Sequence, residues 1–183
     1  MTGDRAGIRT KSMQNSVPYF SQYDTTIPEE WRPRACGVVS LAMALGFILK
    51  KEIVAPELIE EGLKINAYHA GLGWRHDGLV ELANNRGAHA HREEFKKDRE
   101  LQVGIEKIKR VIENKGVPIV SIIVPDMHDT HLVPLTGFNN DGFFYHESAK
   151  KSNDQEVEYV FISNIDFETR WRRLAIFVEP PTR

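Results

Sequence analysis

The chain has 183 residues, of which 41% are hydrophobic and 27% are charged. This length suits one globular domain with a hydrophobic core, and the composition excludes an intrinsically disordered chain. The formal net charge of −2 provides no electrostatic basis for binding nucleic acid. The longest apolar run, residues 37–49, is too short to cross a bilayer, so no membrane partner is expected.

The N-terminal segment is polar. Its first twelve residues, MTGDRAGIRTKS, lack the apolar stretch of a signal peptide, which predicts a cytoplasmic protein. We expect residues 1–16 to form a flexible arm, with Met13 as an alternative natural start. Residues 17–183 are expected to form a single domain.

The first half of this domain is predicted to be helical. Residues 17–22 are short, apolar and extended, and a polar loop follows at 23–34. Residues 36–49 are apolar on nearly all sides, which indicates a central, buried helix. Further helices are predicted at 56–64, between an N-cap at Asp77 and a closing Gly87, and at 99–115.

Strands dominate the second half. The segment 139–142, Asn-Asn-Asp-Gly, predicts the turn of a hairpin. Strands are predicted at 118–124, 131–138, 143–147, 156–162 and 174–178, with a helical turn at 166–171. Helices followed by an antiparallel sheet indicate the α+β class. The sequence contains no glycine-rich phosphate-binding loop, so no nucleotide cofactor is expected.

A single cysteine, Cys36, stands at the start of the central helix. It excludes an internal disulfide and leaves two interpretations, a small buried hydrophobic residue or a nucleophile. At a helix N-terminus, unpaired backbone N–H groups and the helix dipole favour the thiolate, which is the nucleophilic form. The position therefore favours a catalytic role.

A nucleophile that attacks a carbonyl also needs an oxyanion donor and a base. Gln22, which follows the extended segment, offers a side-chain amide that can act with the backbone N–H of Cys36. His131 begins an apolar strand, and Glu147 on the returning strand can accept the second N–H of its ring. The alternative interpretation of Gln22 is a surface glutamine. The seven histidines are His69, His76, His89, His91, His128, His131 and His146.

Three sets of motifs together resemble the bacteriocin-processing, double-glycine peptidase family of papain-like cysteine peptidases. They are Val17-Pro-Tyr-Phe-Ser-Gln22, Arg34-Ala-Cys-Gly-Val-Val-Ser-Leu-Ala-Met43 and His131-Leu-Val-Pro-Leu-Thr-Gly137. The segments 73–79 and 167–171 are similar to its single-domain members, so the resemblance runs from about Val17 to Val178. It implies a papain-like fold, with a helical N-terminal lobe whose central helix packs on a twisted antiparallel sheet.

The same resemblance implies roles for four residues: Cys36 as nucleophile, His131 as base, Glu147 as the orienting acid and Gln22 in the oxyanion hole. It implies hydrolysis of a peptide or other amide bond through a thioester, without a cofactor. Glu147-Ser148 departs from the usual Asp-Pro of the family. The chain also contains no transporter segment, so cleavage of a leader peptide during export is not expected.

The predicted hairpin leaves a gap in this triad. A three-residue loop, 140–142, puts Gly142 in the left-handed conformation and Glu147 opposite Leu135. His131 then lies four residues from Glu147's position, or about 13 Å at roughly 3.3 Å per residue. Pro134 cannot donate to a β-ladder, so we expect its strand to be an edge or to be bulged there. A bulge at this point, or strong coiling of the strands, must close the gap.

Three other interpretations compete with this one. A binding module could keep the fold and take up a peptide or small molecule without turnover. His128 with His131, or His89 with His91, could bind a metal, but no HExxH or paired-cysteine motif is present and we expect no metal. His76 is an alternative base, although a loop histidine has no orienting partner in the sequence.

Overall fold

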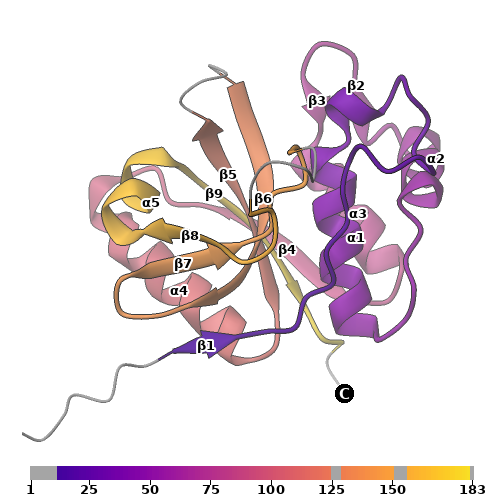
Figure 1. The fold of residues 1–183 in the computed structure, drawn as a ribbon. Coiled ribbons are helices and arrows are strands. Elements are labelled where there is room, and N and C mark those ends of the chain that lie inside the picture. The colour runs from indigo at the N-terminus through magenta and orange to yellow at the C-terminus, as the bar shows by residue number, and fades with distance from the viewer. Residues whose placement is uncertain (1–11, 125–128, 151–155, 182–183) are drawn as a thin grey trace, which may run out of the picture.

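The computed structural model describes residues 12–124, 129–150 and 156–181. Its N-terminal half forms a helical lobe, and the second half contributes most of a large antiparallel sheet (Figure 1). The helical lobe consists of η1 (Arg32–Arg34), α1 (Cys36–Leu49), α2 (Ala55–Lys64), the short strands β2 (Tyr68–His69) and β3 (Gly73–Trp74), and α3 (His76–Asn85). The fold is therefore α+β, as predicted.

Seven strands form the large sheet, in the order β4-β9-β5-β6-β7-β8, with β1 paired to β6. All of these pairs are antiparallel. The strands are β1 (Met13–Gln14), β4 (His89–Glu94), β5 (Val117–Val124), β6 (Asp129–Phe138), β7 (Gly142–Tyr145), β8 (Val160–Ser163) and β9 (Trp171–Glu179). The remaining helices are η2 (Asp98–Glu100), α4 (Leu101–Glu113) and α5 (Asn164–Arg170).

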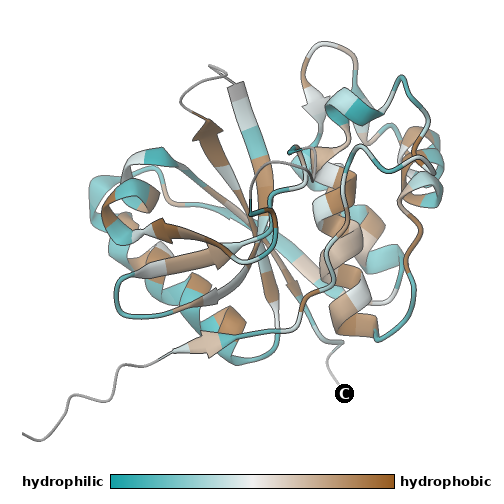
Figure 2. Ribbon diagram, viewed as in Figure 1, coloured by the Kyte–Doolittle hydropathy of each residue, from teal (hydrophilic) through white to brown (hydrophobic). Residues whose placement is uncertain are grey.

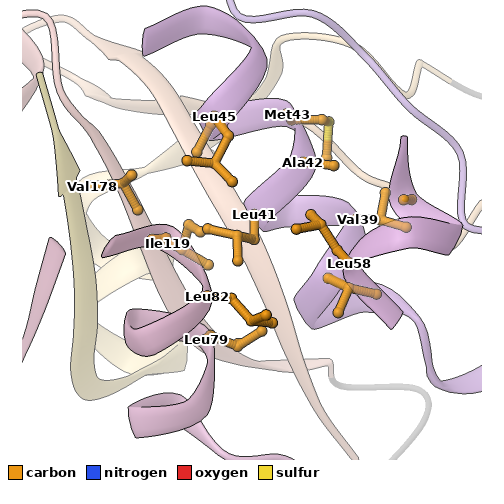
Figure 3. Packing of buried hydrophobic residues seen from close by; sticks show 14 of the residues in the cluster. Val39, Leu41, Ala42, Met43, Leu45, Leu58, Leu79, Leu82, Ile119 and Val178 are labelled. Carbon is orange, nitrogen blue, oxygen red and sulfur yellow. The ribbon is translucent and has the colours of Figure 1, made fainter. Parts of the chain in front are cut away.

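The sheet separates two hydrophobic cores. Side chains alternate along its strands, so that Ile119 of β5 joins the core of the helical lobe whereas its neighbour Val120 joins the core beneath α4 and α5. Hydrophobic residues accordingly run along α1 and the strands beside it (Figure 2). Figure 3 shows Leu41 and Leu45 of α1 directed towards Ile119 and Val178 of the sheet. The central helix is thereby fixed against the sheet over most of its length.

The prediction for α1 is confirmed at both ends. Its residues from Gly37 to Leu45 are all buried, as expected of a helix that is apolar on nearly every side. The helix ends where Lys50 adopts a left-handed conformation with φ 52°. Ser40 fastens the helix to the sheet, because its hydroxyl donates a 2.9 Å hydrogen bond to the carbonyl of Leu132 in β6. Among the described residues, no helix has the length and apolar character needed to cross a membrane.

The strand β4 was not predicted from the sequence. Five of its six residues, HAHREE, are polar, and only Ala90 is buried. They become a strand because β9 pairs with them from His89↔Glu179 to Glu94↔Leu174. The prediction of a helical first half missed this strand, since pairing with a distant strand outweighs weak local propensity.

The N-terminal segment joins the sheet before Val17. Met13 and Gln14 form β1, which the sequence placed in the flexible arm, and pair with Phe138 and Gly137 of β6. Asn15 is buried and donates side-chain hydrogen bonds to the carbonyls of Ile112 and Gly116. The last residues of the predicted arm are thus held in place, while residues 1–11 lie outside the described residues.

The hairpin between β6 and β7 differs from the predicted register. Asn139 donates its backbone N–H to the carbonyl of Gly142 at 2.9 Å, so the loop has two residues rather than three. Gly142 does not adopt a left-handed conformation, and that expectation was wrong. The glycine is needed for space instead, because a Cβ atom at this position would lie 2.0 Å from the carbonyl oxygen of Ile162.

Candidate active site

Cys36 is the first residue of α1, where the tertiary structure leaves its thiol partly buried. The backbone N–H groups of Gly37 and Leu132 favour a negative charge on its sulfur and lower the pKa of the thiol. The N-cap, Ala35, offers no side-chain hydrogen bond, so the N-terminal N–H groups of the helix are not satisfied by a capping side chain. The thiol therefore lies where the backbone itself favours a negative charge.

The neighbourhood of Cys36 is closely packed. A Cβ atom added to Gly37 would lie 3.1 Å from Cβ of Trp74 and 3.3 Å from a methyl carbon of Leu132. The indole N–H of Trp74 donates a 2.9 Å hydrogen bond to the carbonyl of Arg34. This contact holds the segment that leads into α1 and so positions the cysteine. The only signal for this contact in the sequence is the presence of a tryptophan before α3.

His131 and Glu147 lie side by side. The Nε2 atom of His131 is 2.7 Å from Oε1 of Glu147, and the two residues are only 8% and 6% exposed. The same carboxylate oxygen accepts a 2.9 Å hydrogen bond from the backbone N–H of Ala149. A carboxylate held from two sides fixes both the position and the orientation of the imidazole ring.

A β-bulge brings these two residues together. Phe138 pairs with Phe143 and Gly137 with Phe144, but the register shifts before Leu135, which pairs with Tyr145. One extra residue of β6, Thr136, is thereby accommodated, and the N–H of His146 bonds to the carbonyl of Pro134. The shift moves Glu147 along β6 towards His131. The predicted pairing of Glu147 with Leu135 was wrong, whereas the bulge near Pro134 is confirmed.

The charges of Cys36 and His131 are coupled. Burial raises the pKa of the Cys36 thiol, but a hydrogen bond to His131, the charge of that ring and the two backbone N–H groups lower the pKa by more. Burial lowers the pKa of His131, but hydrogen bonds to Cys36 and Glu147 and their negative charges raise it to about 10. Since Nε2 faces Glu147, Nδ1 remains for the thiol. The pair therefore favours thiolate and imidazolium.

Glu147 remains ionised in this environment. Burial raises the pKa of its carboxyl group, but the hydrogen bond and charge of His131 and the N–H of Ala149 lower the pKa below its usual value. The backbone of Glu147 is fixed as well, because its N–H donates to the carbonyl of Val157 and its own carbonyl accepts a 3.3 Å hydrogen bond from the hydroxyl of Tyr19. The negative charge is thus held beside the imidazolium.

Gln22 is buried, with 3% exposure, and is not a surface glutamine. Its Nε2 donates a 2.8 Å hydrogen bond to the carbonyl of Arg32, four residues before Cys36. Its Oε1 accepts a 3.1 Å hydrogen bond from the hydroxyl of Ser148, and its backbone N–H donates to the carbonyl of that residue. The side-chain amide of Gln22 has two N–H groups. One donates to the carbonyl of Arg32, so the second is available to a ligand.

Ser148 was noted in the sequence only as a departure from the family pattern. It is fully buried, and its hydroxyl donates to the oxygen of the Gln22 amide, whose nitrogen is fixed by the carbonyl of Arg32. The residue thus links the segment that carries Gln22 to the strand end that carries Glu147. Its position directly after the predicted orienting acid was the one signal that could have identified it.

The other histidines have different surroundings. His146 is fully buried, with Nε2 2.9 Å from the carbonyl oxygen of Val17 and Nδ1 accepting the N–H of Tyr159. Burial lowers the pKa of this ring, and it acts as a neutral link between segments. His76 is the first residue of α3, whose N-cap is Arg75 rather than Asp77, and burial lowers its pKa also. His128 lies outside the described residues.

A helix-borne thiol and a strand-borne histidine on opposite sides of an interface between a helical lobe and a sheet define the papain-like class of cysteine hydrolases. The family model for Peptidase_C39-like proteins matches residues 14–175. The chain therefore belongs to this family and is a cysteine peptidase-like hydrolase. No curated protein matches it in sequence.

Solved structures share the fold at low identity. A C39-like peptidase from Bacillus anthracis superposes with a TM-score of 0.67 at 16% identity, over 94% of this chain and all (100%) of the other. A double glycine motif protease from an AMS/PCAT transporter, in complex with its leader peptide, gives a TM-score of 0.59 at 20% identity, over 93% and 95% of the two chains. The peptidase domain of Streptococcus ComA gives 0.56 at 20% identity, over 81% and 93%.

Proposed function

We propose that this protein hydrolyses peptide or closely related amide bonds through a thioester intermediate. The observation that carries the proposal is the arrangement of His131, whose Nε2 is 2.7 Å from Glu147, while the interaction of its ring with Cys36 lowers the pKa of the thiol and raises that of the imidazole. A module that only binds a ligand has no need of a cysteine whose pKa is lowered by an oriented histidine. Membership of a peptidase family supports the same conclusion.

In the first half-reaction, the Cys36 thiolate attacks the carbonyl carbon of the scissile amide. The carbonyl π electrons move to the oxygen, and the resulting oxyanion accepts hydrogen bonds from the Cys36 backbone N–H and the free N–H of Gln22. The His131 imidazolium then donates its Nδ1 proton to the leaving nitrogen as the C–N bond breaks. An amine departs, and a thioester to Cys36 remains.

In the second half-reaction, neutral His131 removes a proton from water as the water oxygen attacks the thioester carbonyl. The C–S bond breaks, the acid product forms and the thiolate–imidazolium pair is restored. Glu147 stabilises the imidazolium in both stages without taking up a proton. Since the structural neighbour described above binds a leader peptide, we propose a peptide segment as the substrate.

The proposal is tested by turnover of a peptide library in water enriched in ¹⁸O, with products identified by mass spectrometry. Hydrolysis through a thioester predicts one ¹⁸O atom in each new carboxylate and, with added hydroxylamine, a hydroxamate in place of that acid. Cys36→Ala, checked for its fold by circular dichroism, serves as the control. A peptide that binds the wild-type protein without any cleavage would instead support a binding module.

A further inference from the structure

A second group of ionisable side chains lies on the outer strand β4 and its neighbour β9. His89 lies directly opposite Glu179 in the antiparallel register, and His91 is two residues further along β4. Each of the three side chains offers one nitrogen or oxygen atom, and these atoms all lie within 4.8 Å of one another. We propose that His89, His91 and Glu179 form a binding site for one divalent transition-metal ion such as Zn²⁺.

The strand geometry explains the convergence. Residues i and i+2 of a strand project from the same face, and residues directly opposite on paired strands have Cβ atoms about 4.5–5.5 Å apart. Nδ1 of His91 lies 3.8 Å from Oε1 of Glu179. Two ligands that are each about 2.1 Å from a tetrahedral Zn²⁺ ion are separated by about 3.4 Å. Small side-chain rotations are therefore sufficient to close the site around an ion.

The surroundings of His91 fit a metal ligand. Its ring lies 5.3 Å from the ring of Phe177, which limits its rotation. Its Nε2 is 3.4 Å from Oε1 of Glu93, on the side away from the Nδ1–Glu179 contact. A metal-bound histidine usually donates its second ring N–H to a carboxylate, and Glu93 is placed to accept it.

The local charge also favours a cation. Lys107 of α4 forms a salt bridge with Glu93, and its ammonium lies 5.0 Å from the centre of the Phe177 ring. Glu93 offsets this positive charge, and the carboxylate of Glu179 remains to offset part of the charge of an ion. Two imidazoles and one carboxylate suit Zn²⁺, Co²⁺ or Ni²⁺, whereas Mg²⁺ and Ca²⁺ prefer oxygen ligands. Three protein ligands leave a further coordination position for water.

This site is separate from the candidate active site. Val178, next to Glu179, pairs with Val117 of β5, whereas His131 pairs with Ile122 of the same strand. The five residue steps from Val117 to Ile122 span about 17 Å along the sheet at roughly 3.3 Å per residue. Strands β9 and β5 also lie between β4 and β6. A bound ion would crosslink the outer strand to β9 without touching the thiol, so the inference does not depend on the proposed function.

Metal titration of untagged protein tests the inference. Cys36→Ala is the background for every measurement, because a thiolate beside an imidazole would itself bind Zn²⁺. We expect Co²⁺ to bind with a stoichiometry of one ion per chain, monitored by its visible absorption, and Zn²⁺ to displace it. His91→Ala and Glu179→Gln should each weaken binding by more than roughly tenfold. Tenfold is the lower end of the loss seen when only a residue that hydrogen-bonds to a metal ligand is changed, and these variants remove a ligand itself.

His69→Ala is the matched control, since this exposed histidine of β2 lies outside the cluster and its removal should leave the affinity unchanged. Zn²⁺ should also raise the melting temperature of the background protein but not that of a His89→Ala/His91→Ala double variant. Glu179→Gln preserves the size of the side chain and serves where a histidine variant does not fold. The inference is overturned if no single ion binds saturably, or if the double variant retains the affinity.

Discussion

His131 Nε2 and Glu147 Oε1 are 2.7 Å apart although 16 residues separate them in the chain, and the contact depends on one bulged residue of β6. Without the bulge at Thr136, the pairing of Phe138 with Phe143 would continue to place Glu147 opposite Pro134, three positions from His131, instead of opposite Val133, two positions away. The bulge thus decides whether the imidazole has an orienting partner. Glu147 contacts the ring at 2.7 Å with a side chain one methylene longer than the aspartate usual in the family.

Glu147→Gln should lower kcat on the order of a hundredfold, within the range for loss of acid–base support, while the fold is retained. The amide can still contact the ring, but it carries no negative charge to stabilise imidazolium. Steady-state kinetics and circular dichroism check this. The kcat of Glu147→Asp should lie between those of the wild-type protein and Glu147→Gln, because the shorter side chain keeps the charge but withdraws it from Nε2 of His131. Equal activity in all three proteins would show that Glu147 does not orient His131.

The thiol should react with iodoacetamide at pH 6, well below the range of an ordinary cysteine, whose pKa is about 8.5. The pKa of Cys36 is lowered mainly through His131, against the opposing effect of burial. His131→Ala should therefore shift the alkylation profile towards that of a free thiol. Mass spectrometry of the labelled peptide measures both profiles. Alkylation of the wild-type protein that begins only near pH 8.5 would identify Cys36 as an inert structural residue.

The alkaline limb of activity should lie near pH 10. The folded-state pKa of His131 is raised to about 10, so the stabilising charge of its imidazolium is fully present below the ordinary histidine pKa of about 6.5 and is lost as the pH rises through about 10. Both kcat/KM and the free energy of unfolding should fall there. In Glu147→Gln the limb should move to lower pH, because one of the contacts that raise the pKa is weakened. An unmoved limb would assign it to another group.

His131→Ala should abolish turnover and leave the fold intact, whereas His76→Ala should retain substantial activity. His131 has both the thiol and Glu147 as partners, while the pKa of His76 is lowered by burial and by Arg92 and Arg172. Both variants remove an imidazole of equal size, so each controls for the other. The base would have to be reassigned to His76 if its variant kept the fold and lost turnover.

Ser148→Ala should lower kcat severalfold with little change in KM. The hydroxyl fixes the orientation of the Gln22 amide at 3.1 Å, and an amide that rotates presents its oxygen to the oxyanion for part of the time. Ser163→Ala is the control, since this serine caps α5 and its loss costs stability of about 1 kcal/mol without involving Gln22. A similar loss of kcat in both variants would indicate a general effect of stability.

Local signals in the sequence were sufficient for several features of this protein. An apolar run that begins at Cys36 predicts the buried helix α1 with its correct bounds, and the Asn-Asn-Asp-Gly segment predicts the β6–β7 hairpin. The helix start also favours the thiolate form of Cys36. These features depend on residues that are close in the chain, and their physical causes act over one or two turns of backbone.

Other features were decided only by the tertiary structure. The strand β4 exists because β9 pairs with it, and its six residues, five of them polar, show no periodic pattern that predicts a strand. The bulge at Thr136 and the two-residue loop depend on how β6 is held between β5 and β7. Ser148 and Gln22, 126 residues apart, meet because the N-terminal segment runs beside the end of β7. In each case the deciding contact joins residues far apart in the chain, and its geometry is set by packing of the whole sheet.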